Sequence, residues 1–422
     1  MYDVVIVGAG LAGLTCAKTL CDESPHLSVL IVEARSQIGG RVSTLHNFAS
    51  CPISLGAEFI HGEHTILKQH LDELGIPSQP IFTWAQGDGG PHPEHTVSGG
   101  CGYYYVNRTL YRFDSEHPDF IFANQSIHTM NEDTHQTVYE TLVDMGVHPS
   151  MMALMNAGYG NTLCSDIRSL PTKESCIVTD RFEVDGNSEL DCRGHDALLS
   201  YLRKKTEIWT NWPVEQICWK PGFVSITSRK EYITATKVVI TVPLSILQQN
   251  VIEFCPHLPL EKVKMIHQIR MESCLKLALR FSARFVPHDF RGMICEHGVP
   301  EFWTVSNTDE FILMGFATSS YANALHALSR SELKRSVLDQ LDEIFDNKAS
   351  ALFIDMMVQD WTNEPYIKGG YSSPSRNEDR NVLAQPVLNT LFFAGEATQP
   401  KSMVMHAAME SGIRVSNEIQ AK

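Results

Sequence analysis

Apolar residues gather in short runs along the first forty positions of the chain. Residues 4–7 form a continuous apolar run, and residues 27–32 form a second one that ends in an acidic residue. Such runs suit parallel strands that are buried on both faces of a sheet. Residues 14–20 between them have the pattern of a helix. The order predicts a strand–helix–strand unit, the building block of a doubly wound α/β fold.

The same patterns predict further elements along the chain. The runs 103–106 and 110–113 suggest a hairpin that turns at Asn107-Arg108. Continuous or alternating apolar positions predict strands at 214–217, 223–227, 237–242 and 273–281. Helical spacing occurs at about 132–159, 194–202 and 331–344. The stretch 79–102 is rich in Gly, Pro and His, which is typical of a loop.

Composition and charge narrow the class of protein. The chain has 422 residues, of which 43% are hydrophobic. Its length exceeds the usual size of one core and predicts two interleaved domains. Its formal net charge of −15 repels phosphate backbones and anionic lipids, so we expect no nucleic-acid partner. We also expect no membrane partner, because no apolar run reaches the roughly 18–20 residues that cross a bilayer.

The cysteines and the N-terminus indicate the cellular compartment of the protein. Eleven cysteines are scattered along the chain without C-x-x-C spacing, which favours reduced thiols over disulfides or a zinc site. His61 and His64 offer only two candidate ligands, so we predict no metal there. No signal peptide precedes the first predicted strand. These features predict a soluble, cytoplasmic protein; the sequence does not indicate its oligomeric state.

A glycine-rich loop joins the first predicted strand to the helix. Gly8 permits a tight turn, Gly10 lets the backbone approach a pyrophosphate, and Gly13 lets the helix pack close to the strand. Glu33 lies twenty positions beyond the last glycine and can accept hydrogen bonds from an adenosine ribose. The unit predicts a dinucleotide site, which on its own fits either FAD or NAD.

The residues that follow favour FAD. Arg35 is followed by a pair of glycines that ends in Gly40. The glycine pair lets the backbone pass beside a bulky cofactor. The next residue, Arg41, can neutralise phosphate. The stretch resembles the E-A-R-x-x-x-G-G-R segment of the flavin-containing amine oxidase family, which includes monoamine, polyamine and L-amino-acid oxidases. Gln37 stands where many members have a second arginine. The resemblance implies an FAD cofactor.

A second segment extends the resemblance. Gly56, Ala57 and Glu58 begin a stretch that is similar to the family's G-A-x-W-I-H-G segment, which passes near the flavin and the substrate cavity. Phe59 replaces the commoner tryptophan. The resemblance makes His61 a residue that orients a substrate amine or a water, and a histidine held by loop carbonyls is the alternative.

The resemblance also marks residues near the chemistry. Lys276 falls where the family places a lysine that holds a water against flavin N5, although a lysine on the solvent face of a strand is the alternative. Trp361, Gly370 and Tyr371 lie in a segment similar to the family's W-x-x-x-P/Q…G-x-Y-S. Gly370 occupies the position of the flavin-bound cysteine of monoamine oxidases, which implies non-covalent FAD. Tyr371 matches one wall of the family's aromatic cage.

The C-terminal block resembles the family most strongly. A strand is predicted to end at Gly395 and Glu396, and the glutamate can bind ribityl or ribose hydroxyls. A final helix begins near Val404 and Met405, and its N-terminal N–H groups would face flavin N1/O2, where negative charge collects on reduction. Val404 stands where monoamine oxidases have the second cage tyrosine, and Ala407 where most members have glycine. The cage is therefore expected to be one-sided.

The implied architecture is a doubly wound, Rossmann-type FAD-binding domain interleaved with an α+β substrate-binding domain. We assign residues 1–78, 190–250 and 375–422 to the first domain and residues 79–189 and 251–374 to the second. By resemblance, the backbone of Val214 would contact the adenine.

The implied function is oxidation of a polyamine, or of another secondary or primary amine, to an imine that water hydrolyses to an aldehyde. Dioxygen would be reduced to hydrogen peroxide, so an amine and O2 are the predicted partners. L-amino-acid oxidation needs an arginine for the carboxylate, and Arg168, Arg181, Arg291 or another arginine remains a candidate. The sequence is also compatible with a monoamine oxidase and with a catalytically weak flavin-binding interaction protein.

Overall fold

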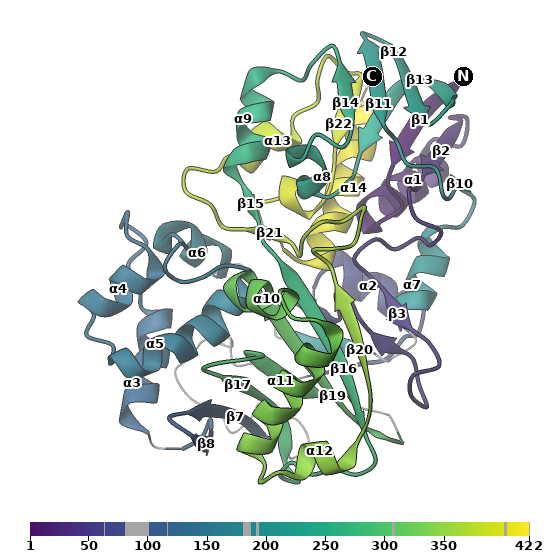
Figure 1. Cartoon of the computed structure of the whole chain (residues 1–422). Coiled ribbons are helices and arrows are strands. Elements are labelled where there is room, and N and C mark those ends of the chain that lie inside the picture. Colours follow the sequence, from purple (N-terminus) through teal and green to yellow (C-terminus); the bar gives the residue numbers. More distant parts are fainter. Residues whose placement is uncertain are drawn as a thin grey trace.

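The structure is a computed structural model that describes residues 1–62, 64–80, 101–115, 117–179, 187–190, 194–305, 309–400 and 403–421. Its elements form two groups, the upper and lower halves of Figure 1, and each group is built on one large sheet. Both termini lie in the upper group.

The first sheet has a parallel centre made from segments far apart in the chain. Its strands lie in the order β10-β2-β1-β13, and β22 also pairs with β13. These parallel strands are β1 (Tyr2–Val7), β2 (Val29–Val32), β10 (Glu207–Trp209), β13 (Glu231–Ile240) and β22 (Leu391–Phe393). The sheet continues from β13 through β12 (Phe223–Ser228), β11 (Gln216–Lys220) and β14 (Glu253–Cys255). All of β2 is buried, as its apolar run predicts for a central strand.

Helices cover both faces of this sheet. One face packs against α1 (Leu11–Glu23), α2 (Ile66–Glu73), α7 (Gly194–Leu202) and α14 (Met405–Gln420). The other face packs against α8 (Leu244–Gln248), α9 (Leu260–Gln268) and α13 (Arg380–Ala384). The doubly wound α/β arrangement predicted from the first forty residues is therefore confirmed.

The second sheet forms the core of the lower group. Its strand order is β20-β16-β19-β18-β17-β7-β8, and only the β17–β7 pair is parallel. The strands are β7 (Cys101–Val106), β8 (Thr109–Arg112), β16 (Cys274–Phe281), β17 (Phe290–Cys295), β18 (Glu301–Thr304), β19 (Phe311–Thr318) and β20 (Phe353–Asp360). One core cluster joins it to α10 (Ser319–His326), α11 (Arg330–Ile344) and α12 (Lys348–Leu352). Another joins β7 and β17 to α3 (Pro118–His128), α4 (Val138–Asp144) and α5 (Pro149–Met155).

Shorter elements complete the described chain. β3 (Thr44–Leu45) pairs with β4 (Ile53–Ser54), and β15 (Arg270–Met271) pairs with β21 (Ser372–Ser373). A three-stranded sheet contains β5 (Phe59–His61), β9 (Asn187–Leu190) and β6 (Ser78–Pro80). The remaining short helix is α6 (Thr172–Thr179). Among the described residues, no helix is both long and apolar enough to span a membrane. The ten cysteines in these residues are all free thiols.

The predicted elements match the structure unevenly. The hairpin at 103–113 is confirmed, because Asn107 and Arg108 both have positive φ (50° and 60°), the conformation of a tight hairpin turn. The helical spacing at 132–159 corresponds to α4, α5 and a π-helical turn at Asn156–Gly160. Gly146 turns the chain with φ 85° after α4, and Pro149 begins α5. Most of the loop predicted at 79–102 lies outside the described residues.

Candidate active site

A cavity of about 1290 Å³ is lined by residues of both groups. Residues that follow β1 and β2, including Gly10 and Glu33, form one part of its wall. Side chains of the second sheet, including Lys276 and Glu301, form another part. Parallel α/β sheets bind ligands beyond the carboxyl ends of their strands, so the cavity lies where this fold places a cofactor.

The three glycines at the junction of β1 and α1 have different surroundings. A Cβ on Gly13 would lie 2.0 Å from the carbonyl oxygen of Gly8, so the close approach of α1 to the loop requires glycine there. Gly8 has φ 111°, and a Cβ on it would lie 2.6 Å from Oγ1 of Thr241. At Gly10, by contrast, a Cβ would meet no atom within 4 Å. Gly10 therefore leaves room for a ligand next to the N-terminus of α1, which fits a pyrophosphate.

Glu33 is held in place by the backbone of the same loop. Its two carboxylate oxygens accept hydrogen bonds from the backbone N–H groups of Ala9 (2.7 Å) and Arg35 (2.9 Å). Burial raises the pKa of Glu33, although these hydrogen bonds oppose the shift. A carboxylate fixed at the cavity wall in this way can accept hydrogen bonds from ribose hydroxyls.

Arg41 and Glu396 form a polar cluster between the two groups of elements. Nη1 of Arg41 donates to Oε1 of Glu396 (3.0 Å) and to the carbonyl of Gly370 (2.8 Å). Glu396 also accepts from Oγ of Ser372 (2.6 Å) and from the N–H of Met403 (3.3 Å). Burial alone would raise the pKa of Glu396, but Arg41 and the Ser372 hydrogen bond hold it below its usual value. The cluster ties the start of α14 to the segment that carries Tyr371.

Lys276 lies in the interior and not on a solvent face. Its side chain on β16 is 4% exposed, and its Nζ is 2.5 Å from Oε2 of Glu58, whose side chain is 8% exposed. The Nζ also donates to the carbonyl of Gly56 (3.0 Å) and lies 5.2 Å from the ring centre of Trp303. This arrangement holds a compensated positive charge at the cavity wall.

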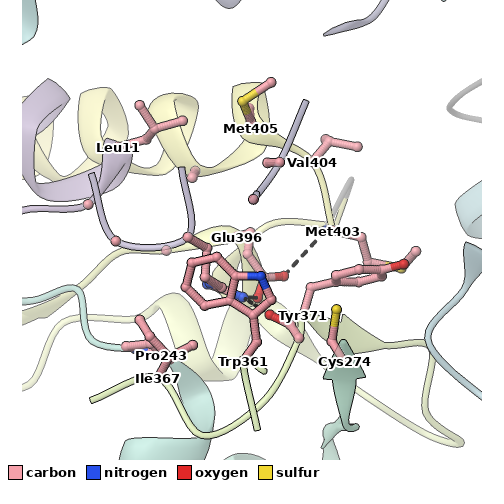
Figure 2. Close-up of a pocket in the computed structure, with 18 of the residues that line it drawn as sticks. Leu11, Pro243, Cys274, Trp361, Ile367, Tyr371, Glu396, Met403, Val404 and Met405 are labelled. Carbon is pink, nitrogen blue, oxygen red and sulfur yellow. Dashed lines mark hydrogen bonds and ion pairs between the residues drawn. The ribbon is translucent and has the colours of Figure 1, made fainter. Parts of the chain in front are cut away.

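Tyr371 places an aromatic ring in the cavity wall close to the segment that leads into α14. Figure 2 shows its ring beside Met403 and Cys274, with the indole of Trp361 near the carboxylate of Glu396. The Tyr371 hydroxyl donates to the carbonyl of Thr162 (2.7 Å), so the phenol is anchored at its outer end. Burial raises the pKa of Tyr371 well above its usual value, which keeps the hydroxyl protonated.

Comparisons with known proteins identify the family. The model of the flavin-containing amine oxidoreductase family matches residues 11–420, nearly the whole chain. The chain belongs to this family. Polyamine oxidase 3 of Oryza sativa subsp. japonica is 26% identical to it over 447 residues, which cover 100% of this chain and 89% of that protein. An L-amino-acid oxidase of Siganus canaliculatus is 27% identical over 466 residues, which cover 99% of this chain and 85% of that protein.

Solved structures confirm the fold of this amine oxidoreductase. The structure of wild-type putrescine oxidase bound to putrescine superposes with a TM-score of 0.82 at 18% identity, covering 100% of this chain and 99% of that one. Together with the family, this match establishes a flavin amine oxidoreductase with the predicted architecture. The domain boundaries and the roles of single residues stay predictions.

Most residues predicted from the amine oxidoreductase motifs line the cavity described above. Those that line it are Gly8, Gly10, Glu33, Gly40, Arg41, Gly56, Ala57, Glu58, His61, Val214, Lys276, Trp361, Tyr371, Gly395, Glu396, Val404 and Met405. Gly13 and Arg35 lie outside the cavity wall. Gly13 acts through helix packing, and Arg35 donates to the carbonyl of Gly40 (3.0 Å) and faces Glu364 (3.6 Å). Arg35 therefore supports the loop that contains Gly40.

The motifs missed several cavity residues of this amine oxidoreductase. They are Tyr159, Thr162, Cys274, Glu301, Trp303 and Phe316. Oε2 of Glu301 accepts a hydrogen bond from Nδ2 of Asn161 (3.3 Å), and burial raises the pKa of Glu301 to about 7. The sequence carried one signal: Glu301 and Trp303 alternate with the buried Phe302, so both belong to one face of a strand.

Proposed function

We propose that the protein is an FAD-dependent oxidase of a polyamine or another extended primary or secondary amine. The amine becomes an imine, which water hydrolyses to an aldehyde, while O2 is reduced to H2O2. The observation that carries this proposal is that one cavity joins the dinucleotide loop at Gly10 to Lys276 and Tyr371. Ten free thiols suit a reducing compartment, so we propose a cytoplasmic location.

The residues present fit FAD. Space at Gly10, the N-terminus of α1 and the carboxylate of Glu33 would hold the pyrophosphate and ribose, and the start of α14 would face the ring. When bound, FAD supplies the hydride acceptor for the carbon next to the amine nitrogen. Lys276 keeps a positive charge and N–H donors at this part of the wall. Tyr371 offers an aromatic face that orients the amine, and the apolar surroundings favour its uncharged form.

The charges of the cavity favour an amine over an amino acid. Among the described lining residues, the lysine and arginine side chains are Lys276 and Arg41, and each is paired with a glutamate. Neither of the two described candidates for a carboxylate clamp lines the cavity. Arg168 stacks on the ring of Tyr139 at 4.3 Å, and Arg291 is exposed. Arg181 lies outside the described residues.

Anaerobic mixing tests this function. The purified yellow protein is mixed without oxygen with a panel of polyamines, diamines, monoamines and L-amino acids, and the flavin absorbance is followed. We expect extended amines to bleach the flavin and amino acids to leave it unchanged. Readmitted oxygen should restore the colour with one H2O2 formed per amine. If an amino acid bleaches it instead, the amine assignment is wrong; if nothing does, a weak flavin-binding interaction protein becomes the better explanation.

The flavin should be held without a covalent bond. Gly370 has no sulfur, and a Cβ added there would lie 2.6 Å from Cβ of Cys274, so the site has no room for a cysteine without rearrangement. Acid precipitation should therefore release all the yellow colour into the supernatant. The Cys274→Ser variant, which removes a thiol from the cavity wall, should release the same fraction. Flavin fluorescence that stays with the protein on a denaturing gel would contradict this prediction.

A further inference from the structure

Two cysteines lie opposite each other at the edge of the first sheet. Cys218 on β11 is the register partner of Cys255 on β14, the last strand in the order of this sheet (Figure 1). Neighbouring strands lie about 4.8 Å apart. Disulfides join residues whose Cα atoms are about 4.4–6.8 Å apart, so the two cysteines can form one without a change of register.

The pair lies on the solvent side of the sheet. Ile217 and Trp219, the neighbours of Cys218 along β11, are buried in the core under α8, α9 and α13. Side chains alternate along a strand, so Cys218 points to the opposite face, where it is half-buried and Cys255 is exposed. A small oxidant dissolved in water can therefore reach the sulfur of Cys255.

The two side chains interact with each other. Burial raises the pKa of the Cys218 thiol, and the hydrogen bond with Cys255 and the carboxylate of Glu253 raise it further. Cys218 therefore stays protonated at neutral pH and can donate its S–H to a neighbouring sulfur. The exposed Cys255 is then the sulfur that reacts first with an oxidant, and Cys218 is the thiol that reacts with the product.

Oxidation suits this pair better than metal binding. A closed zinc site takes its ligands from four side chains. Among the residues that the structure describes, no group of three or more His, Cys, Asp and Glu side chains could hold a metal ion. Two adjacent thiols, by contrast, are sufficient for a disulfide.

Both strands lead away from the wall of the cavity. Glu215 directly precedes β11 and Ile252 directly precedes β14, and both residues line the cavity. The N–H of Glu253 donates to the carbonyl of Glu215 (2.8 Å), so the two segments are joined next to the cavity. Each cysteine lies three residues beyond the cavity residue of its own segment. A bond between the sulfurs would therefore restrain these two parts of the wall relative to each other.

We propose that Cys218 and Cys255 form a redox modification site, at which hydrogen peroxide converts two thiols into a disulfide that holds β14 to β11. The thiolate of Cys255 attacks one peroxide oxygen, the O–O bond breaks, and a sulfenic acid and hydroxide form. The sulfur of Cys218 attacks the sulfenic sulfur, the S–O bond breaks, and a second hydroxide leaves. The hydroxides take up the two thiol protons. The pair of thiols loses two electrons, and the peroxide is reduced to two molecules of water.

The inference rests on the proposed function only for the source of the peroxide, because an amine oxidase would form it in the adjoining cavity. The site itself is tested with added peroxide, whether or not any amine is oxidised.

The main test exposes the reduced, flavin-loaded protein to a small excess of hydrogen peroxide. Free thiols are then alkylated, and disulfide-linked peptides are identified by mass spectrometry after proteolysis without reductant. We expect the peptides of Cys218 and Cys255 to become linked at least about tenfold faster than any other pair, because exposure and a neighbouring thiol favour oxidation. Dithiothreitol should separate them again. A protein in which these two cysteines stay reduced, or in which another pair is linked first, overturns the inference.

Three variants locate the chemistry. Cys218→Ser should leave a sulfenic acid on Cys255 that dimedone traps, because the second thiol is gone. Cys255→Ser should abolish the linkage. Cys101→Ser is the matched control, because Cys101 is also half-buried and lies in a parallel strand pair, but its register partner is Phe290. This control should form the Cys218–Cys255 linkage at the wild-type rate, and a control that loses the linkage contradicts the assignment.

The disulfide should also slow the release of the flavin. It restrains the segments that contain Glu215 and Ile252, which form part of the cavity wall. We expect the flavin to leave the oxidised protein at least about threefold more slowly than the reduced protein, because a restrained site loses less freedom when it holds its ligand. Peroxide should not change the release rate of Cys255→Ser. Equal release rates for the two forms of the wild-type protein would overturn the link between this site and the cavity.

A last arm uses turnover as the source of peroxide. An amine that reduces the flavin, supplied together with oxygen, should produce the same linkage, and catalase should suppress it. Linkage with added peroxide but not during turnover contradicts only the proposed source of the peroxide. A flavin that no amine reduces contradicts the proposed function, and the experiment with added peroxide still decides whether the two cysteines form the site.

Discussion

Replacing Lys276 by methionine is expected to slow amine-dependent oxygen consumption by about 100-fold or more while the protein keeps its flavin. The Nζ of Lys276 provides a buried positive charge and N–H donors at the cavity wall, and the loss of one such preorganised donor costs about 10²–10³ in rate. Methionine has a similar length and apolar stem, so the wall keeps its shape. The rate is measured with an oxygen electrode at saturating amine, and the flavin content by absorbance.

The control for this variant follows from the ion pair. Removing Lys276 leaves Glu58 buried without its partner at 2.5 Å, which costs about 3–5 kcal/mol of stability on its own. The double variant Lys276→Met/Glu58→Gln removes both charges and should recover most of the thermal stability but none of the activity. A single variant that turns over at the wild-type rate would count against a catalytic role for Lys276.

The cofactor end of the molecule could be predicted from the sequence because its residues act locally. Gly8, Gly10, Gly13 and Glu33 belong to one strand–helix–strand unit, in which each position has a geometric task set by its neighbours in the chain. In the structure, a Cβ at Gly13 would lie 2.0 Å from the carbonyl oxygen of Gly8, and a Cβ at Gly10 would meet no atom within 4 Å. This geometry agrees with the tasks predicted for these two glycines, and their role in binding the cofactor stays a prediction.

The substrate end could be predicted only in part because it is assembled from distant segments. Lys276 and Glu58 are 218 positions apart, and no motif contains both. Glu301, Phe316 and Lys276 lie in one row only because β18, β19 and β16 are neighbours with a particular register. A shift by one residue would turn all of one strand's side chains to the other face. The sequence showed the alternation within each strand but not the strand order.

The helical block at 132–159 also shows what the sequence pattern predicts and what it does not. Its apolar spacing reflects burial at Val138, Leu142 and Met151, which lie in one core cluster, but not at Val143, which is 49% exposed. Gly146 and Pro149 nevertheless divide it into α4 and α5, and a π-helical turn at Asn156–Gly160 follows. The apolar periodicity therefore predicted most of the buried positions. The backbone preferences of glycine and proline decided where the helices end.

Replacing Gly10 by valine is expected to produce a folded protein that has lost its flavin. The backbone of Gly10 has φ −78° and ψ −178°, which any residue can adopt, and a Cβ there meets nothing within 4 Å. The valine side chain would instead fill the space next to the N-terminus of α1. We expect flavin binding at least about 100-fold weaker, equivalent to about 3 kcal/mol, measured by titration of the apoprotein with FAD.

Gly13→Ala is the matched comparison, because Gly13 lies three residues after Gly10, in the first turn of α1. A Cβ at Gly13 would lie 2.0 Å from the backbone oxygen of Gly8, so α1 or the loop must move, and we expect a loss of about 3 kcal/mol in stability. Circular dichroism and thermal melting should therefore show Gly10→Val close to the wild-type apoprotein and Gly13→Ala well below it. If Gly10→Val binds FAD normally, the cofactor does not approach the backbone at Gly10. The assignment of this end of the cavity to the pyrophosphate would then be wrong, and with it the position of the flavin relative to Lys276.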